Sequence, residues 1–325
     1  MEIEHIAYGP VPSRRLGRSL GINNVPPKAC SYSCVYCQLG DTVNVLVGRK
    51  KFHKAEDVAR IVGEKVKRVK DRGETVDYLT FVADGESTLD VDLGQEIELL
   101  KPLGIRIAVI TNASLICRED VRRDLQKADW VSLKVDAVSG EIWRRINRAP
   151  KPLELEAILE GMLGFATTFG GELATESMLV QGMNSSVAEI EGIADFLVEL
   201  KPNIAYLAVP TRPPAKKAMA IPSEQAINAA YQILSQRLAR VEYLIGYEGN
   251  AFASSGDVEG DLLGITLVHP MREEAVTEFL RKSGGDWGVV EKLVNDGSLI
   301  ELEYRGSRFY VRKLPWDSRD SWGER

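Results

Sequence analysis

Short apolar runs rich in β-branched residues alternate along the chain with longer segments whose apolar residues recur at helical spacing. Six such runs predict strands: Ser19–Asn23, Val76–Ala83, Arg106–Thr111, Trp130–Asp136, Leu173–Val180 and Asn203–Val209. Helical spacing is clearest in three of the intervening segments, Lys54–Lys70, Ser185–Leu200 and Ser223–Leu238. Strands that alternate with helices predict an α/β fold with a parallel sheet and right-handed crossovers. The pattern fits an open doubly wound sheet as well as a complete or partial barrel.

The pattern changes after His269 and Pro270. Two helices, Arg272–Lys282 and Trp287–Val294, are followed by the strands LIELEY and RFYVRKL, which a turn at residues 305–307 joins. Two helices and a hairpin in this order resemble a winged helix. The sequence therefore predicts four parts: a core at residues 1–255, a connector at 256–270, a winged-helix-like domain at 271–314 and a polar tail at 315–325.

Composition adds few constraints to this picture. Of the 325 residues, 44% are hydrophobic and 27% are charged, which is typical of a soluble globular protein. A net charge of −6 gives no general reason to expect a nucleic acid or a membrane surface as partner. No apolar run is long enough to cross a bilayer, and the first residues lack the layout of a signal peptide. We expect a cytoplasmic protein with no membrane partner.

The cysteines carry the clearest chemical signal. Cys30, Cys34 and Cys37 form a C-x3-C-x2-C motif, whereas Cys117 stands alone in an apolar stretch and is expected to be a small buried hydrophobe. Cysteine thiolates are the usual ligands of iron–sulfur clusters, and a [4Fe–4S] cluster normally takes four of them. Three cysteines on one loop would leave one iron open to a ligand that is not protein.

Two other interpretations of these cysteines are a structural zinc site and buried thiols without a ligand. Structural zinc requires four ligands in a closed tetrahedron. The three histidines, His5, His53 and His269, lie far from the motif in sequence. The spacing therefore favours the cluster.

The residues around the motif resemble a known family. Tyr36 directly before the last cysteine gives C-x3-C-x-aromatic-C, which is similar to the signature of the radical S-adenosylmethionine (SAM) superfamily. The segment GPVPSRRLGRSLGINNVPPKACSYSCVYCQLG resembles a subfamily of iron–sulfur oxidoreductases related to the wyosine-base synthases of transfer RNA. The resemblance extends from Tyr8 to about His269. It implies a partial (β/α)6 TIM-like barrel that carries a [4Fe–4S] cluster in the loop at 30–37.

The resemblance also implies a set of SAM-binding residues at the ends of successive strands. They are Tyr36, Gly85, Glu86, Asn112, Ser132, Lys134, Asp136 and Glu176. In the family, the aromatic residue before the last cysteine lies over the adenine, and the Gly–Glu loop receives the ammonium group. This sequence departs from the usual motifs at Asp84 and Ser87, where Gly and Pro are more common, and at Ala113, where Gly is usual.

Arginines in the Pro- and Gly-rich segment before the cysteines are candidates for substrate contact. Arg14, Arg15 and Arg18 could form an ordinary solvated charge run, but their position leads us to the hypothesis that at least one binds an anion. Arg212, just past the sixth predicted strand, is a further candidate.

Taken with the resemblance, these features predict an enzyme in which the cluster reductively cleaves SAM to a 5′-deoxyadenosyl radical that abstracts hydrogen from a substrate. Such an enzyme needs a reducing partner of the flavodoxin or ferredoxin type. The substrate could be a transfer-RNA base, or else a peptide, a protein or a small metabolite. Residues 271–313 contain eight Lys and Arg and eight Asp and Glu, so their charge does not favour RNA over peptide. A non-catalytic metal-binding protein is the third alternative.

Overall fold

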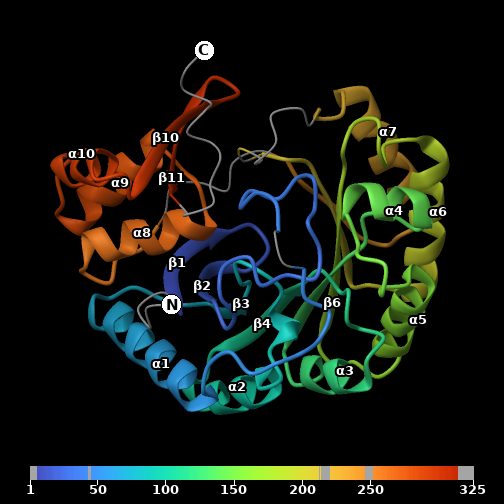
Figure 1. Cartoon of the computed structure of the whole chain (residues 1–325), viewed down its shortest axis with the longest axis horizontal. Coiled ribbons are helices and arrows are strands. Elements are labelled where there is room, and N and C mark those ends of the chain that lie inside the picture. Colours follow the sequence, from blue (N-terminus) through green and yellow to red (C-terminus); the bar gives the residue numbers. More distant parts are fainter. Residues whose placement is uncertain (1–5, 43–44, 212, 214–219, 246–251, 314–325) are drawn as a thin grey trace.

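The computed structural model describes residues 6–42, 45–211, 213, 220–245 and 252–313 (Figure 1). Its centre is a sheet whose strand order follows the chain, so that each strand lies beside the next one in sequence. The strands are β1 (Ala7–Ser13), β2 (Gly17–Ile22), β3 (Tyr78–Phe81), β4 (Arg106–Thr111), β5 (Trp130–Lys134), β6 (Glu172–Met178), β7 (Ile204–Ala208) and β8 (Val241–Leu244). β1 pairs antiparallel with β2, and β2 to β8 are parallel. The six predicted strands are confirmed as β2 to β7, and β1 and β8 extend the sheet at its two edges.

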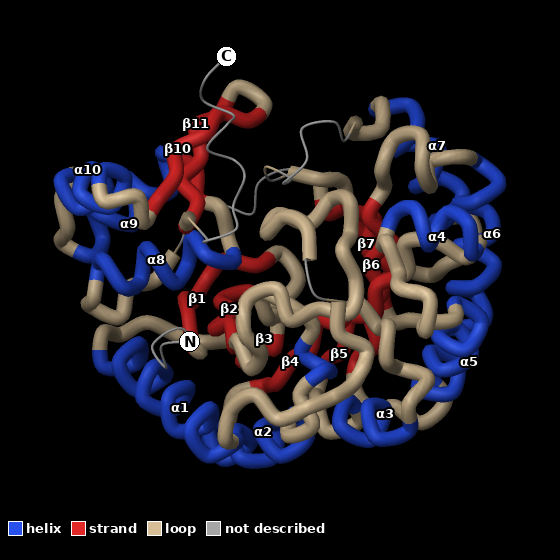
Figure 2. Tube along the Cα trace, viewed as in Figure 1, coloured by secondary structure: helices blue, strands red, loops and turns tan. Residues whose placement is uncertain are grey.

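The helices of the core form an outer layer around the curled, half-barrel sheet (Figures 1 and 2). They are α1 (Ala55–Asp71), α2 (Leu93–Leu100), α3 (Glu119–Leu125), α4 (Gly140–Ile146), α5 (Leu155–Ala166), α6 (Val187–Leu200) and α7 (Glu224–Ser235). The three helices expected from periodicity are α1, α6 and α7. In the part of the chain that the structure describes, no helix is both long and apolar enough to cross a membrane.

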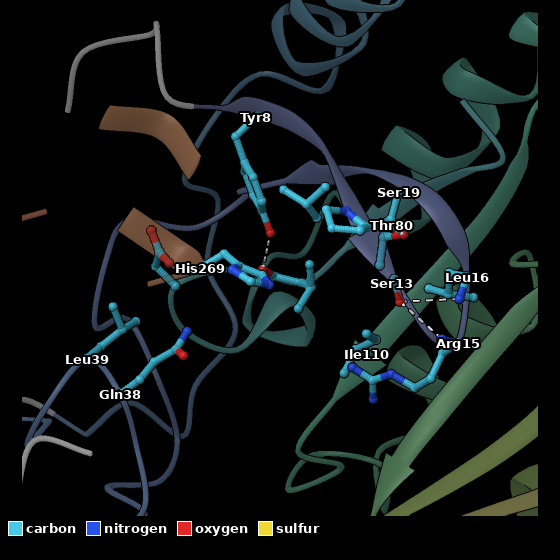
Figure 3. Close-up of a pocket in the computed structure, with 15 residues that line it drawn as sticks. Tyr8, Ser13, Arg15, Leu16, Ser19, Gln38, Leu39, Thr80, Ile110 and His269 are labelled. Carbon is cyan, nitrogen blue, oxygen red and sulfur yellow. Dashed lines mark hydrogen bonds between the residues drawn. The ribbon is translucent and has the colours of Figure 1, made fainter. Parts of the chain in front are cut away.

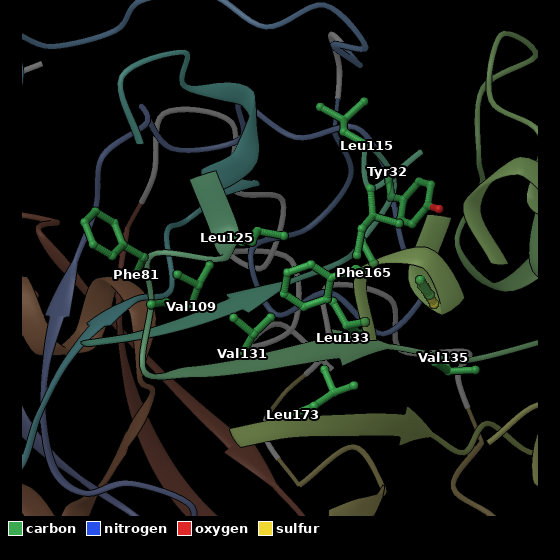
Figure 4. Close-up of a cluster of buried hydrophobic side chains, with 14 of the residues drawn as sticks. Tyr32, Phe81, Val109, Leu115, Leu125, Val131, Leu133, Val135, Phe165 and Leu173 are labelled. Carbon is green, nitrogen blue, oxygen red and sulfur yellow. The ribbon is translucent and has the colours of Figure 1, made fainter. Parts of the chain in front are cut away.

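Alternation along each strand divides the side chains between the two faces of the sheet. In β5, Val131 and Leu133 belong to the large apolar core that includes Phe165 of α5 (Figure 4). Trp130 belongs to a separate cluster on the inner face, as period-two geometry requires. Burial of each large side chain of the outer core contributes about 1.5–3 kcal/mol to folding. The outer face therefore supplies the main core of the fold.

The hairpin formed by β1 and β2 has its tip on the inner face of the sheet. Leu16 at this tip is buried in the inner cluster, which also includes Ala108 and Trp130. β1 is an edge strand whose register shifts between Tyr8 and Val11. Proline is tolerated at such an edge because no further strand needs its missing N–H group. The strand therefore accommodates the prolines of its sequence, AYGPVPS.

A second, smaller core lies near the C-terminus. We call residues 252–313 the C-terminal unit. It contains α8 (Val258–Val268), α9 (Glu273–Ser283) and α10 (Gly288–Asn295), with a small sheet of β9 (Met271–Arg272), β10 (Leu299–Tyr304) and β11 (Ser307–Arg312). The helices and hairpin expected here are α9, α10, β10 and β11.

The segment 256–270, which we expected to be a connector, contains α8. Leu262 and Ile265 of this helix are buried in the core of the C-terminal unit. Asp261 on the same helix accepts a hydrogen bond from Lys65 of α1 at 2.5 Å, and both side chains are buried. The segment 256–270 therefore joins the C-terminal unit to the large domain through a helix that is packed against both.

Candidate functional site

A cavity of about 340 Å³ opens at the carboxyl ends of the parallel strands, where α/β folds generally form their ligand sites. Its walls come from the cysteine loop and from the ends of β3 to β8. Eleven residues that the sequence predicted for the site line it: Arg14, Arg15, Cys30, Cys34, Tyr36, Cys37, Gly85, Glu86, Asn112, Lys134 and Glu176. Side chains separated by up to 162 positions in sequence therefore meet in one place.

The cysteine loop is anchored by backbone hydrogen bonds to two neighbouring segments. The N–H groups of Ser33 and Val35 donate to the carbonyl oxygens of Asn147 and Ile146, at 3.1 and 2.9 Å. These carbonyls lie at the C-terminal end of α4, where helix carbonyls lack partners within the helix. On its other side, the loop carbonyl of Cys30 accepts from Leu46 N–H at 2.9 Å. The cysteine loop is therefore held between the C-terminal end of α4 on one side and the segment at Leu46 on the other.

Each of the three cysteine sulfurs accepts an N–H from a different side chain. Asn112 Nδ2 donates to Cys30 at 3.6 Å, Asn147 Nδ2 donates to Cys34 at 3.4 Å, and Lys28 Nζ donates to Cys37 at 3.8 Å. Hydrogen bonds to sulfur ligands stabilise their negative charge and tune cluster potentials. Neither Lys28 nor Asn147 was among the site residues that the sequence predicted.

Burial makes the thiolate form costly at two of these cysteines. It raises the pKa of Cys30 far above its ordinary value, and it raises the pKa of Cys34 to about 12, with the neighbouring acidic groups adding to both shifts. Thiolates at these positions therefore need a nearby positive charge, which bound iron would supply. Three cysteine sulfurs that share one cavity, each with its own N–H donor, fit the ligand set of an iron–sulfur cluster.

The loop after β3 packs directly against the cysteine loop. A Cβ atom on Gly85 would lie 2.0 Å from the carbonyl oxygen of Ala29, so only glycine fits here. The buried carboxylate of Glu86 accepts four hydrogen bonds, from the N–H and hydroxyl of Thr88, the hydroxyl of Thr111 and the N–H of Asn112, at 2.6–3.0 Å. Glu86 therefore ties the ends of β3 and β4 together.

Two cations meet one carboxylate on the inner face of the sheet. Glu176 accepts from Lys134 Nζ at 2.5 Å and also from Arg15 Nη1. Burial lowers the pKa of Lys134, but attraction to Glu176 and Asp136 outweighs it and leaves this pKa above its ordinary value. The Lys134 ammonium also lies 4.9 Å from the ring centre of Tyr36, a favourable cation–π distance.

Tyr36 is fixed from its hydroxyl end. Its hydroxyl donates to Asp136, which also accepts from Asn147 Nδ2 at 2.8 Å and from the N–H of Met178 at 2.9 Å. Burial raises the pKa of Asp136, and Lys134 opposes that rise. The ring of Tyr36 is therefore held at the cavity wall by residues from two strands and one helix end.

Several predicted site residues lie outside the cavity wall. Ser132 is buried on β5 two residues before Lys134, and Asp136 supports Tyr36 from behind. Arg18 lies on β2, beyond the hairpin tip that enters the cavity. Its exposed side chain pairs with Glu74 at 3.1 Å. The proposed substrate role of Arg18 is therefore not supported, and Arg212 lies outside the described residues.

Cys117 is exposed, which corrects our expectation of a buried thiol. It lies in the turn between β4 and α3, where the apolar run ends and charged residues begin. Apolar sequence neighbours do not guarantee burial in such a turn. Cys117 does not line the cavity and cannot complete the set of three cysteines there.

Comparison with known proteins places this geometry in a family. The model of the radical SAM superfamily matches residues 24–169. The UPF0026 protein MJ1312 of Methanocaldococcus jannaschii is 48% identical over 97% of this chain and 98% of its own length. Among solved structures, the fold is similar to TYW1 with a lysine–pyruvate adduct bound (TM-score 0.54, 18% identity, 68% of this chain and 74% of that one). It is also similar to a radical SAM methyltransferase from Sphaerobacter thermophilus (TM-score 0.52, 17% identity, 73% and 70%).

These matches agree with the curled α/β sheet and with the cysteine motif, which lies inside the matched segment. Enzymes of this superfamily use a [4Fe–4S] cluster and SAM, and they require an electron donor. The chain therefore belongs to the UPF0026 family within the radical SAM superfamily, and it is an iron–sulfur enzyme with these two cofactors.

Proposed function

We propose that Cys30, Cys34 and Cys37 hold a [4Fe–4S] cluster at the floor of the main cavity and leave its fourth iron for SAM. The observation that carries the proposal is the convergence of three hydrogen-bonded sulfurs on one cavity, with Cys117 elsewhere. When bound, the cluster and SAM would supply a 5′-deoxyadenosyl radical that abstracts hydrogen from the substrate.

The chain's own residues would hold and orient SAM. We propose that the ring of Tyr36 faces the adenine, because Asp136 and Lys134 fix its position. Asn112 would contact SAM close to Cys30, and the loop at Gly85 and Glu86 would approach its methionine part. Since four donors of the chain already occupy the Glu86 carboxylate, we assign it first to shaping this loop. Lys134 and Glu176 would contact the ribose or the methionine part.

The placement of cysteines supports a cluster over a single zinc ion. In the part of the chain that the structure describes, no three His, Cys, Asp or Glu side chains lie close enough together to hold one metal ion. In a [4Fe–4S] cluster, each cysteine binds a different iron, so the sulfurs lie farther apart than around zinc. A non-catalytic zinc protein is therefore the weaker alternative.

Two substrate classes are the candidates: an RNA base, and a peptide or small metabolite. We propose a winged-helix-like domain at residues 271–313, with Arg305, Arg308 and Arg312 at its wing. Arg308 pairs there with Glu273 at 3.4 Å and with Glu301 at 3.2 Å. A wing whose arginine is neutralised in this way is a poor phosphate-binding surface. The charges of the wing therefore weigh against RNA as the substrate. An RNA base is still tested as a substrate because of the resemblance to wyosine-base synthases of transfer RNA.

Anaerobic reconstitution with iron and sulfide tests the proposal. We expect the visible absorption of a [4Fe–4S] cluster and, with dithionite and SAM, the formation of 5′-deoxyadenosine. Cys34→Ser should lose both, and Cys117→Ser should keep both because its thiol is remote from the cavity. Intact cluster formation in Cys34→Ser, or no 5′-deoxyadenosine from the loaded wild type, would contradict the proposal.

We propose that a flavodoxin- or ferredoxin-like protein is the natural electron donor, whose place dithionite takes in the assay above. A cytoplasmic location stays a prediction. Reduced flavodoxin should replace dithionite in the same assay. The measured product is again 5′-deoxyadenosine.

A further inference from the structure

Two largely buried arginines stand in different relations to the main cavity. Arg15 lines the main cavity and also the smaller pocket drawn in Figure 3, and it pairs with Glu176. The side chain of Arg49 is only 4% exposed, yet it lies outside the wall of the main cavity in the part of the chain that the structure describes. Any effect of Arg49 on the site must therefore pass through the residues that it contacts.

All three nitrogens of the Arg49 guanidinium are hydrogen-bonded, and they contact two separate parts of the chain. Nε donates to the carbonyl oxygen of Thr88 at 2.9 Å, and Nη2 donates to that of Asp90 at 2.5 Å. Nη1 donates to Asp120 at 3.0 Å, and Nη2 also donates to Asp124 at 2.5 Å, both on α3. One side chain therefore fastens the turn that contains Thr88 to α3.

This turn depends on a donor from outside. It is the 3₁₀ turn η2 (Ser87–Leu89), which is too short to provide partners for all of its own carbonyl groups. Thr88 and Asp90 are at most 1% exposed, so water cannot take the place of Arg49. Removing a donor from a buried carbonyl oxygen is costly, and the turn would have to open to relieve the cost.

The turn is connected to the cavity wall through Glu86. The N–H and the hydroxyl of Thr88 donate to Glu86 Oε1 at 3.0 and 2.7 Å. Glu86 Oε2 accepts the N–H of Asn112 at 2.8 Å, and Asn112 Nδ2 donates to the sulfur of Cys30 at 3.6 Å. Glu86, Asn112 and Cys30 all line the main cavity. A continuous chain of hydrogen bonds therefore leads from Arg49 to a cysteine sulfur.

We propose that Arg49 is a positioning residue for SAM. By fastening η2 to α3, it keeps Thr88 on the carboxylate of Glu86, and Glu86 in turn fixes Asn112 beside Cys30. The inference rests on the proposed function, because it concerns the two residues of the cavity wall, Glu86 and Asn112, that shape and contact the SAM site there. It assigns a role in SAM binding to a side chain that does not itself reach the cavity.

Arg49→Lys tests this role. The variant keeps a positive charge beside Asp120 and Asp124, but a single ammonium lacks the planar fork that reaches both carbonyl oxygens as well. Equilibrium dialysis with the oxidised, cluster-loaded protein should show a dissociation constant for SAM that is about tenfold higher than in the wild type. Arg118→Lys is the matched control. Arg118 is exposed and pairs with the same Asp120 at 2.9 Å, so its replacement should leave the dissociation constant unchanged.

A dissociation constant in Arg49→Lys equal to that of the wild type would overturn the proposal. Phe165→Ala separates positioning from a general loss of stability, because its ring is buried in the outer core. Cluster-loaded Phe165→Ala should bind SAM as the wild type does. If it binds SAM as weakly as Arg49→Lys, the effect of Arg49 is one of stability alone and the proposal is wrong.

Thr88→Val tests the connection without changing Arg49. It removes the hydroxyl that donates to Glu86 and should also weaken SAM binding. In the double variant with Arg49→Lys, the two losses should overlap and not multiply, because both changes act on the same carboxylate. Normal SAM affinity in Thr88→Val, or two losses that multiply, would contradict a connection through Thr88.

The two proposals fail in different ways. If the cluster-loaded wild type binds no SAM, the proposed function is wrong and the role of Arg49 is wrong with it. If the wild type binds SAM and Arg49→Lys binds it equally well, the proposed function stands and only the role of Arg49 is wrong.

Discussion

The two faces of the curled sheet bury different kinds of side chain at similar depth. On the outer face, Val131, Leu133 and Leu173 pack beneath the helices with no polar group among them (Figure 4). On the inner face, the same strands place Lys134 and Glu176 beside the cavity, where each depends on an ionic partner. Apolar packing is stabilising by itself, whereas a buried ion pair is stabilising only while both partners are present. The outer face therefore maintains the fold, and the inner face holds chemical groups at a cost in stability.

The largest stability loss is expected on the outer face. Phe165→Ala removes a fully buried ring between α5 and the sheet, so the free energy of unfolding should fall by about 3–5 kcal/mol. Urea denaturation measures the change. Phe169→Ala is the matched control, because this ring stacks on Phe165 at 4.7 Å but is only half-buried, and it should cost less. Equal losses in the two variants would show that the outer core is not the main source of stability.

A smaller loss is expected on the inner face. Lys134→Met leaves Glu176 with Arg15 as its remaining cation, and we expect a loss of about 2 kcal/mol because a buried carboxylate loses part of its compensation. The same variant should bind SAM more weakly, as measured by equilibrium dialysis. Lys151→Met changes an exposed lysine and should alter neither quantity. Unchanged stability in Lys134→Met would mean that the ion pairs of the inner face contribute nothing.

One acid of the outer layer breaks the rule of apolar packing. Glu96 on α2 is fully buried, and its carboxyl accepts a hydrogen bond from Asn24 Nδ2 at 3.0 Å. Burial raises the pKa of Glu96 to about 9, and repulsion from Asp90 adds to the rise. A folded-state pKa above the unfolded one means that stability is fully present below about pH 4.5 and declines as the pH rises towards 9.

Glu96→Gln removes this dependence, because the amide does not titrate. The variant should match the wild type near pH 4.5 and exceed it by a margin that grows as the pH rises towards 9. Urea denaturation across this range measures the difference. A wild-type advantage that grows with pH would show that Glu96 is ionised and favourably paired in the folded protein.

A variant of Lys28 tests the cysteine loop through the reduction potential of the bound cluster and not through the free energy of unfolding. Lys28→Met removes the ammonium group 3.8 Å from the sulfur of Cys37. Loss of a positive charge disfavours the more negative, reduced cluster, so the reduction potential should fall, by less than about 60 mV. An EPR-monitored redox titration measures it. A rise in potential would contradict the hydrogen bond to the sulfur.

The smallest effect is expected at Ala113, next to the cluster site. Its φ of 59° lies in the left-handed region, which favours glycine. Ala113→Gly relieves this strain but loses one buried methyl group, and each contribution is about 1 kcal/mol. The free energy of unfolding should therefore change by less than about 1 kcal/mol, as measured by urea denaturation. A larger loss would show that the methyl group is needed for packing.

The sequence predicted the parallel strands from local rules and most of the cavity wall from the resemblance to the radical SAM superfamily. Short apolar runs rich in β-branched residues identified β2 to β7, and the polar residues at their carboxyl ends meet in one cavity as parallel strands require. β1 was missed because Pro10 and Pro12 argue against a central strand, and only the edge position allows them. β8 has only four residues, too few for a clear period.

The remaining differences depend on tertiary contacts. Arg15 and Arg18 stand three residues apart, yet one turns into the cavity with the hairpin tip and the other pairs with Glu74 outside. Lys28 contacts Cys37 only because the loop folds back on itself. Asp84 was visible as a departure from the family motif, but its lack of strong partners appeared only in the structure.

EPR spectroscopy of the dithionite-reduced, reconstituted protein tests the central claim most directly. If three cysteines leave one iron of the cluster open, addition of SAM must change the spectrum of the reduced cluster, because SAM becomes a ligand of that iron. We predict such a change in the wild type and in Cys117→Ser. A reduced [4Fe–4S] spectrum that is identical with and without SAM would contradict the account.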